Sequence, residues 1–164
     1  MVTGSTSAGG LASQNAEASC LAAYNHAVGL VPTVALVASD LGGVTLSPGV
    51  YTFPTPSATL TTTVTLDGTG NPNGQFIFQI STTFSSAAGS KVLLVGGAQA
   101  CNVFFVLGTS AAIGAKSEIR GNILAGTLIA ASEGASGIGT WCSLNAAVTL
   151  INNALTAQTV CTSV

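Results

Sequence analysis

The stretch from Cys101 to Leu150 constrains the fold more than any other part of the chain, because it repeats one pattern three times. The repeats open at Asn102, Asn122 and Cys142, about twenty residues apart. Each contains three short apolar segments separated by Gly, Ser or Ala. This spacing is typical of a β-solenoid, in which stacked coils bury residues that no single coil can bury alone.

Apolar segments elsewhere in the chain align with these repeats in three columns, one for each side of a coil. The first column carries bulky residues on both faces and is predicted to lie under a helix; it holds residues 50–53, 76–80, 102–107, 122–124 and 142–145. The third column, with Lys116, Glu118 and Arg120, is predicted to be solvated; it holds residues 64–66, 92–95, 117–120, 136–139 and 154–157. The pattern predicts a mostly β fold, a solenoid of about five coils.

The second column is predicted to present a flat, uncharged face, and it holds residues 57–61, 81–85, 110–114, 128–132 and 147–151. Side chains alternate across a strand, so placing Leu60, Phe84, Ile113, Ile129 and Val148 inward turns the residues between them outward. The outward set consists mainly of small side chains, many of them hydroxylated: Ser57, Thr59, Ser81, Thr83, Ser85, Ser110, Ala112, Leu128, Ala130, Ser132, Ala147 and Thr149.

Residues 1–10 are predicted to be an irregular lead-in without the pattern of a signal peptide, and residues 11–164 a single domain. The one predicted helix covers residues 11–28, with Ser13 as its N-cap and Gly29 at its end. At about 1.5 Å per residue it would be roughly 25 Å long and could cover one side of the solenoid. His26 is interpreted as solvated or capping. Residues 34–39 fit either a strand or a connection.

Only 5% of the residues are charged, against about 25% in ordinary globular domains. The sequence therefore offers neither a basic surface for nucleic acid nor a polybasic membrane anchor, and no apolar run is long enough to span a bilayer. Asp67, Glu118 and Glu133 fall in different columns or loops, and there is one histidine. We therefore predict no catalytic site, no metal site and no cofactor.

Four cysteines allow three pairings. Cys142 and Cys161 are one coil apart, so stacking would bring them to roughly 5 Å, whereas Cys101 and Cys142 would be about 10 Å apart, too far for a disulfide. The spacing predicts Cys142–Cys161 and, across the helix and the first column, Cys20–Cys101. Four buried free thiols are the alternative. The even number of cysteines and the low charge suit an oxidising, extracellular setting.

Five motifs resemble the microbial ice-binding (antifreeze) protein family, in the same order: residues 46–53 (LSPGVYTF), 76–79 (FIFQ), 97–104 (GAQACNVF), 121–125 (GNILA) and 147–150 (AVTL). The resemblance implies a right-handed β-solenoid of triangular section with one helix alongside. It also implies that the outward residues of the second column contact ice. Family members usually carry a longer, secreted N-terminal region that caps the solenoid, and this chain is expected to lack it.

The resemblance thus implies an ice-binding protein whose partner is the ice crystal surface, extracellular and expected to be monomeric. The alternative is a non-catalytic adhesive or structural solenoid that binds a cell wall, a polysaccharide or like chains. Carbohydrate binding would favour exposed aromatic residues, but Tyr51 and Trp141 fall in the first column and Tyr24 on the helix. This distribution favours ice.

Overall fold

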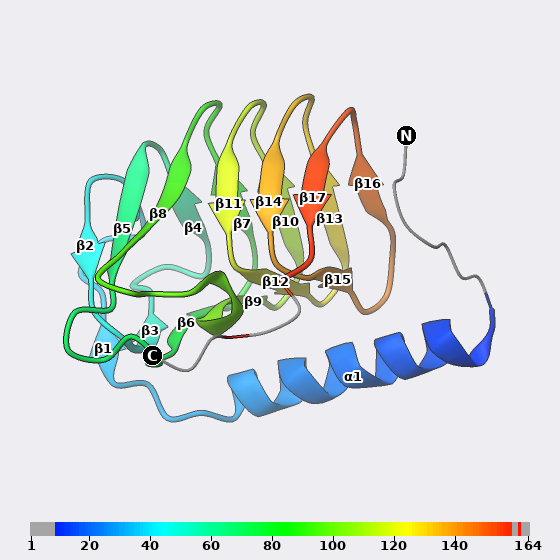
Figure 1. Ribbon diagram of the computed structural model, residues 1–164, viewed down its shortest axis with the longest axis horizontal. Coiled ribbons are helices and arrows are strands. Elements are labelled where there is room, and N and C mark those ends of the chain that lie inside the picture. Colours follow the sequence, from blue (N-terminus) through cyan, green and yellow to red (C-terminus); the bar gives the residue numbers. More distant parts are fainter. Residues whose placement is uncertain (1–8, 159–160, 162–164) are drawn as a thin grey trace.

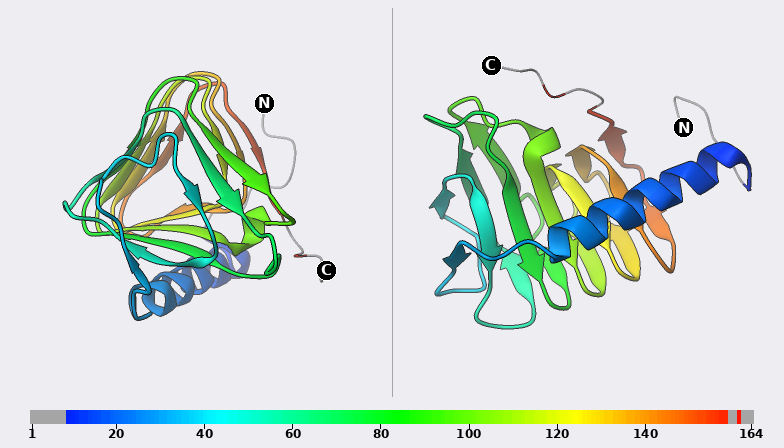
Figure 2. Two further views of the ribbon diagram at one scale, coloured as in Figure 1. Left: turned by 90° about the vertical axis from the view of Figure 1, so that its left-hand side faces the viewer. Right: turned by 90° about the horizontal axis from the view of Figure 1, so that it is seen from below.

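Three parallel β-sheets enclose one core in the computed structural model, which describes residues 9–158 and 161 (Figure 1). Seen along the long axis, the sheets form the three sides of a triangle (Figure 2). From β3 onward the chain adds one strand to each sheet in turn before starting the next coil, whereas β1 and β2 belong to a first coil that gives no strand to the five-stranded sheet. The β-solenoid predicted from the repeats is confirmed, and the three columns correspond to the three sheets.

Sheet A is the first column, in the order β1-β3-β6-β9-β12-β15. Its strands are β1 (Val34–Ala35), β3 (Gly49–Thr52), β6 (Phe76–Ile80), β9 (Val103–Leu107), β12 (Asn122–Ala125) and β15 (Trp141–Ser143). A 3₁₀ turn, η1 (Ala100–Asn102), leads into β9. The stretch left open by the sequence is therefore a two-residue strand followed by a connection.

Sheet B is the second column, in the order β16-β13-β10-β7-β4. Its strands are β4 (Ala58–Leu60), β7 (Phe84–Ser86), β10 (Ser110–Ile113), β13 (Leu128–Ala131) and β16 (Val148–Leu150). Sheet C is the third column, in the order β17-β14-β11-β8-β5-β2. Its strands are β2 (Thr45–Leu46), β5 (Thr63–Asp67), β8 (Lys91–Val95), β11 (Glu118–Arg120), β14 (Ser136–Ile138) and β17 (Ala154–Thr156).

An aromatic stack forms the centre of the core. The ring centroids of Tyr51 and Phe78 are 5.3 Å apart, and those of Phe78 and Phe105 are 4.9 Å apart. Phe105 also stacks on Phe84 of sheet B at 5.0 Å, which joins two sides of the triangle. The parallel register places Tyr51, Phe78 and Phe105 directly over one another, so the repeat itself generates the stack.

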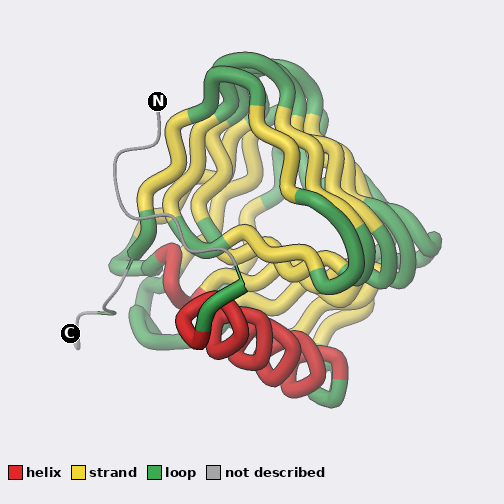
Figure 3. Tube along the Cα trace, turned by 90° about the vertical axis from the view of Figure 1, so that its right-hand side faces the viewer, coloured by secondary structure: helices red, strands yellow, loops and turns green. Residues whose placement is uncertain are grey.

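Helix α1 (Leu11–Val28) has the predicted bounds and runs along sheet A (Figure 3). Ala27 of the helix belongs to one buried cluster with Ile77, Val106 and Leu124, which come from three successive strands, and Cys20, Ala23 and Tyr24 pack against this cluster. The predicted N-cap is wrong: Gly10 is the N-cap, and Ser13 lies inside the first turn with its hydroxyl donating to Gly10 O at 2.8 Å. A serine hydroxyl can bond backward to a preceding carbonyl as readily as it can cap.

Gln79 of β6 secures the C-terminal end of the helix. Its Nε2 donates to Ala27 O at 2.8 Å and to Leu30 O at 2.9 Å, so it satisfies carbonyl groups that the helix itself leaves free. We expect Gln79→Leu to lower the free energy of unfolding by about 1–3 kcal/mol, because it leaves partly buried carbonyls without a donor. Urea denaturation measures this loss. Gln75→Leu, at an exposed position on the same coil, is the control and should change stability by less than about 0.5 kcal/mol.

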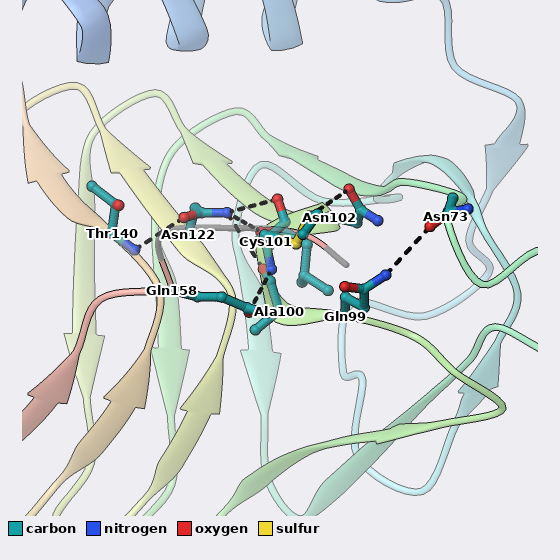
Figure 4. Close-up of a disulfide and its surroundings, with 10 residues drawn as sticks. Asn73, Gln99, Ala100, Cys101, Asn102, Asn122, Thr140 and Gln158 are labelled. Atoms are coloured by element: carbon teal, nitrogen blue, oxygen red, sulfur yellow. Dashed lines mark hydrogen bonds between the residues drawn. A yellow bond between two sulfur atoms is a disulfide. The ribbon is translucent and has the colours of Figure 1, made fainter. Parts of the chain in front are cut away.

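The disulfides join Cys20 to Cys142 and Cys101 to Cys161, so both predicted pairings are wrong. Cys142 pairs in register with Leu124 on the helix-covered side of sheet A, and it therefore meets Cys20, with a Cα–Cα distance of 6.6 Å. Cys161 does not stack on Cys142, although the two are one repeat apart in sequence. The chain leaves the repeating coil after β17, and Cys161 lies beside η1 instead. There Cys101 N donates to Gln158 Oε1 at 3.0 Å, beside the disulfide (Figure 4).

Asn122 connects neighbouring coils at one corner of the triangle. Its Nδ2 donates to Val103 O of the preceding coil at 3.0 Å, and its Oδ1 accepts a hydrogen bond from Thr140 N of the next coil at 3.0 Å (Figure 4). The side chain thus satisfies backbone groups at a corner where the sheet ladders are interrupted. This single side chain therefore joins three successive coils at the corner.

Removing the Cys20–Cys142 bond should lower the free energy of unfolding by about 2–4 kcal/mol, because this bond restricts the unfolded chain over a long loop. The double variant Cys20→Ser with Cys142→Ser avoids an odd thiol, and urea denaturation measures the loss. The matched control replaces Cys101 and Cys161 with serine. The Cys20–Cys142 bond closes a loop of 122 residues and the Cys101–Cys161 bond one of 60 residues. The free energy of unfolding of the control should therefore fall by about 0.6 kcal/mol less than that of the first variant. An undiminished stability of the first variant would contradict a role of this bond in holding the helix.

Candidate functional site

Two parallel rows of small side chains face outward on sheet B. The strand register aligns the first row directly: Thr59, Ser85, Ala112, Ala130 and Thr149. The second row lies two residues earlier along the chain, at the first residue of a strand or directly before it: Ser57, Thr83, Ser110, Leu128 and Ala147. Strand geometry spaces the members of a row about 4.8 Å apart and the two rows about 6.7 Å apart. Ten of the twelve residues predicted for this face therefore lie on one regular grid.

The other two predicted residues lie at the corners of the triangle. Ser81 precedes β7 in the turn from sheet A, and Ser132 follows the last residue of β13. Both are exposed, but neither falls in either row: Ser81 lies two residues before Thr83, and Ser132 two residues after Ala130. The predicted outward segments were longer than the strands at these two points, because the sequence pattern does not mark where the corner turns begin. The grid therefore has two rows of five residues rather than the twelve residues predicted.

The grid rests on a closely packed layer. Seven alternate residues of β4, β7, β10 and β13 point inward and are no more than 3% exposed: Ala58, Leu60, Phe84, Ala111, Ile113, Ile129 and Ala131. On the edge strand β16 this layer thins, and Leu150 is 45% exposed. Val148 packs against the same core. Phe84, one of these inward residues, stacks on Phe105 of sheet A. Interiors packed in this way have low compressibility, so the outward rows are held on a stiff support.

The grid differs from one end to the other. Directly before β4 and β7 the hydroxyls bond to one another: Thr83 Oγ1 donates to Ser57 Oγ at 3.0 Å, and Ser57 Oγ lies 3.0 Å from Thr82 Oγ1. These bonds fix the orientation of the side chains. On β10 and β13 the outward residues include Ala112, Leu128 and Ala130, which offer methyl groups. The face thus combines oriented hydroxyls with an apolar centre.

One charged residue continues the first row, and the sequence analysis missed it. Asp40 forms an isolated parallel bridge with Thr59, so it stands one coil before β4. Its Oδ1 accepts hydrogen bonds from Gly42 N at 2.9 Å and Thr61 N at 3.0 Å, and its Oδ2 accepts one from the Thr61 hydroxyl. The ten grid residues carry no charge, as predicted. The first row, when it is continued to the coil before β4, includes the charged Asp40. A lone bridge leaves no strand-like pattern in the sequence, which is why the analysis missed Asp40.

The sequence model of the family described as Ice-binding-like matches residues 1–156. The chain belongs to this family. An ice-binding protein of Nostoc sp. (strain HG1) is 44% identical over 132 residues, which are 80% of this chain and 48% of that protein. An ice-binding protein of Colwellia sp. is 36% identical over 139 residues, which are 84% of this chain and 53% of that protein.

Solved structures share the fold. The crystal structure of an ice-binding protein from the Antarctic ascomycete Antarctomyces psychrotrophicus superposes with a TM-score of 0.86 at 37% identity, over 90% of this chain and 72% of that one. An ice-binding protein from an Antarctic bacterium, Flavobacteriaceae, gives a TM-score of 0.87 at 37% identity, over 94% of this chain and 37% of that one. The family named from the sequence motifs is thereby confirmed. The chain spans about half the length of the two curated relatives described above.

The other two sides of this ice-binding-like solenoid are less suited to form a flat contact. Helix α1 covers sheet A. Sheet C carries charge: Lys91 Nζ lies 2.6 Å from Glu118 Oε1 across two adjacent strands. Of the charged residues that the sequence places on this side, Lys116 lies in a turn with a φ of 57° rather than on a strand. An exposed pair of this kind contributes little to stability.

Two carboxyl groups of the described residues outside sheet B have pKa values below the usual range. The hydrogen bond and the charge of Lys91 lower the pKa of Glu118, and the hydroxyl and backbone amide of Thr69 lower the pKa of Asp67. Carboxyls with lowered pKa values are ionised at neutral pH and are poor general acids. Within residues 9–158 and 161, no three His, Cys, Asp or Glu residues are grouped to hold a metal ion. In the same part of the chain, no helix is long and apolar enough to cross a membrane.

Proposed function

We propose that this chain adsorbs to ice crystals through the grid on sheet B, and that it thereby depresses the freezing point and inhibits recrystallisation. The observation that carries the proposal is the pair of uncharged rows on a stiff support, in a chain that belongs to the Ice-binding-like family. The relatives at 44% and 36% identity are both named ice-binding proteins.

The physical basis is the ordering of water at the grid. A charged group orients water around itself and opposes an ice-like arrangement, whereas methyl groups and fixed hydroxyls perturb neighbouring water weakly. Holding an ordered water costs only about 0–2 kcal/mol, so a surface that holds many waters in regular positions can join a crystal through many weak contacts. The stiff support reduces the ordering cost that binding would otherwise incur.

The proposal includes a monomeric, extracellular and non-catalytic protein. Two disulfides favour an oxidising compartment. A single flat face can meet a crystal without a partner subunit, so no oligomer is required. The described aromatic residues support ice over a sugar ligand. Tyr51 is 3% exposed, Trp141 packs against the core, and Tyr24 packs between α1 and sheet A.

The direct test is to grow an ice hemisphere from a dilute solution of the fluorescently labelled protein, and to follow recrystallisation of a frozen film in parallel. We expect the label to enter the ice on defined planes and the grain size to stay small. Bovine serum albumin, labelled in the same way, controls for passive trapping. Exclusion of the label from the ice together with normal grain growth would refute ice binding.

A further inference from the structure

Asp40 lies where the first outward row would otherwise continue. Besides the bridge between Asp40 and Thr59, Thr59 N donates to Ser39 O and Leu41 N donates to Thr59 O, at 2.8 and 2.9 Å. The backbone of residues 39–41 therefore extends the ladder of sheet B by one more coil. In this position a small neutral residue would lengthen the row from five members to six.

The carboxylate of Asp40 is fixed in place. Two backbone amides, of Gly42 and Thr61, donate to Oδ1, and the Thr61 hydroxyl donates to Oδ2. Burial alone would raise the pKa of Asp40, but these hydrogen bonds outweigh it and lower the pKa. The group is therefore charged at neutral pH, and its orientation is set by the corner between sheets B and C.

We propose that Asp40 ends the ice-contacting surface, so that adsorption is confined to the part of sheet B formed by β4, β7, β10, β13 and β16. This inference rests on the function proposed above. The charge orients water radially at the first coil, which prevents the ordered layer over Thr59 and Ser85 from extending further. Asp40 thus limits the size of the surface, and with it the strength of adsorption.

Asp40→Asn tests this with little change in shape. The amide oxygen can still accept from both backbone amides, and its NH₂ group can donate to the Thr61 hydroxyl. We expect the concentration that halves recrystallisation to fall about threefold, which corresponds to about 0.7 kcal/mol. The rate at which labelled protein enters an ice hemisphere should rise in parallel. Thermal unfolding and amide hydrogen exchange of Gly42 and Thr61 would show that the corner is retained.

Asp67→Asn is the matched control. Asp67 ends β5 on sheet C, and its Oδ1 also accepts a backbone amide, from Thr69 at 2.9 Å. Both variants change the formal net charge from -2 by the same amount. Asp67→Asn should leave ice adsorption unchanged. An equal gain in both variants, or no gain in a folded Asp40→Asn, would overturn the proposal.

A reciprocal test avoids the corner altogether. Ala112 is exposed in the middle of the row, so Ala112→Asp places the same charge inside the grid and Ala112→Asn provides the neutral match. The aspartate should adsorb at least about tenfold more weakly than the asparagine. Equal adsorption of the two would overturn the boundary role of Asp40. If the unaltered protein does not enter ice, the proposed function fails. If it enters ice and these pairs do not differ, only the boundary fails.

Discussion

Replacing Ala130 with tyrosine should abolish ice shaping and leave the fold intact. Ala130 is exposed on β13, where it lies in the first row of the grid between Ala112 on β10 and Thr149 on β16. A ring at this position stands above the level of the neighbouring methyl groups and holds them away from a flat crystal. The concentration that halves recrystallisation should rise about tenfold or more. Recrystallisation microscopy and photographs of single crystals measure both effects.

The control for this result is Ala154→Tyr. Ala154 is also exposed, but it lies on β17 of sheet C, on a different side of the triangle. This variant adds the same ring and should shape ice like the unaltered protein. Circular dichroism should show that both variants fold. Full activity of Ala130→Tyr would exclude sheet B as the contact face, and a loss in both variants would point to the ring itself rather than to its position.

Phe105→Ala should cause the largest loss of stability among these variants, about 3–5 kcal/mol. Phe105 is fully buried and stacks on Phe78 at 4.9 Å and on Phe84 at 5.0 Å. Its removal leaves a cavity that the surrounding coils cannot close, because their register holds the backbone in place. Because Phe84 supports the grid from beneath, the variant should also adsorb to ice more weakly at a temperature where it is folded.

Urea denaturation measures the first effect and ice uptake of the folded variant measures the second. Leu93→Ala is the matched control, since Leu93 is 44% exposed on β8 of sheet C and should lose about 0.5 kcal/mol or less. A similar loss for both variants would mean that the aromatic stack does not support the core. A destabilised Phe105→Ala with unchanged ice uptake would separate the stiffness of the support from the function of the grid.

The fold and most of the candidate grid could be predicted because their signals are local and repeated. Alternation along each strand identified Leu60, Phe84, Ile113 and Ile129 as inward-facing, and all four are buried. The period of about twenty residues then aligned the strands of successive coils. Since every coil supplies the same information, an error in one coil is corrected by the others. The helix bounds followed from a second local signal, the change to helix formers before Gly29.

The tertiary structure decided whatever depends on where the chain departs from the repeat. Cys161 meets Cys101 rather than Cys142 because the segment after β17 returns to η1 instead of adding a coil. Asp40 joins the outward row through a single bridge, which no periodic pattern marks. A repeat encodes what each coil contributes to the next, since neighbouring coils share one geometry. The start of the row and the course of the chain beyond the last strand depend on contacts between residues far apart in the sequence, and only the folded chain sets them.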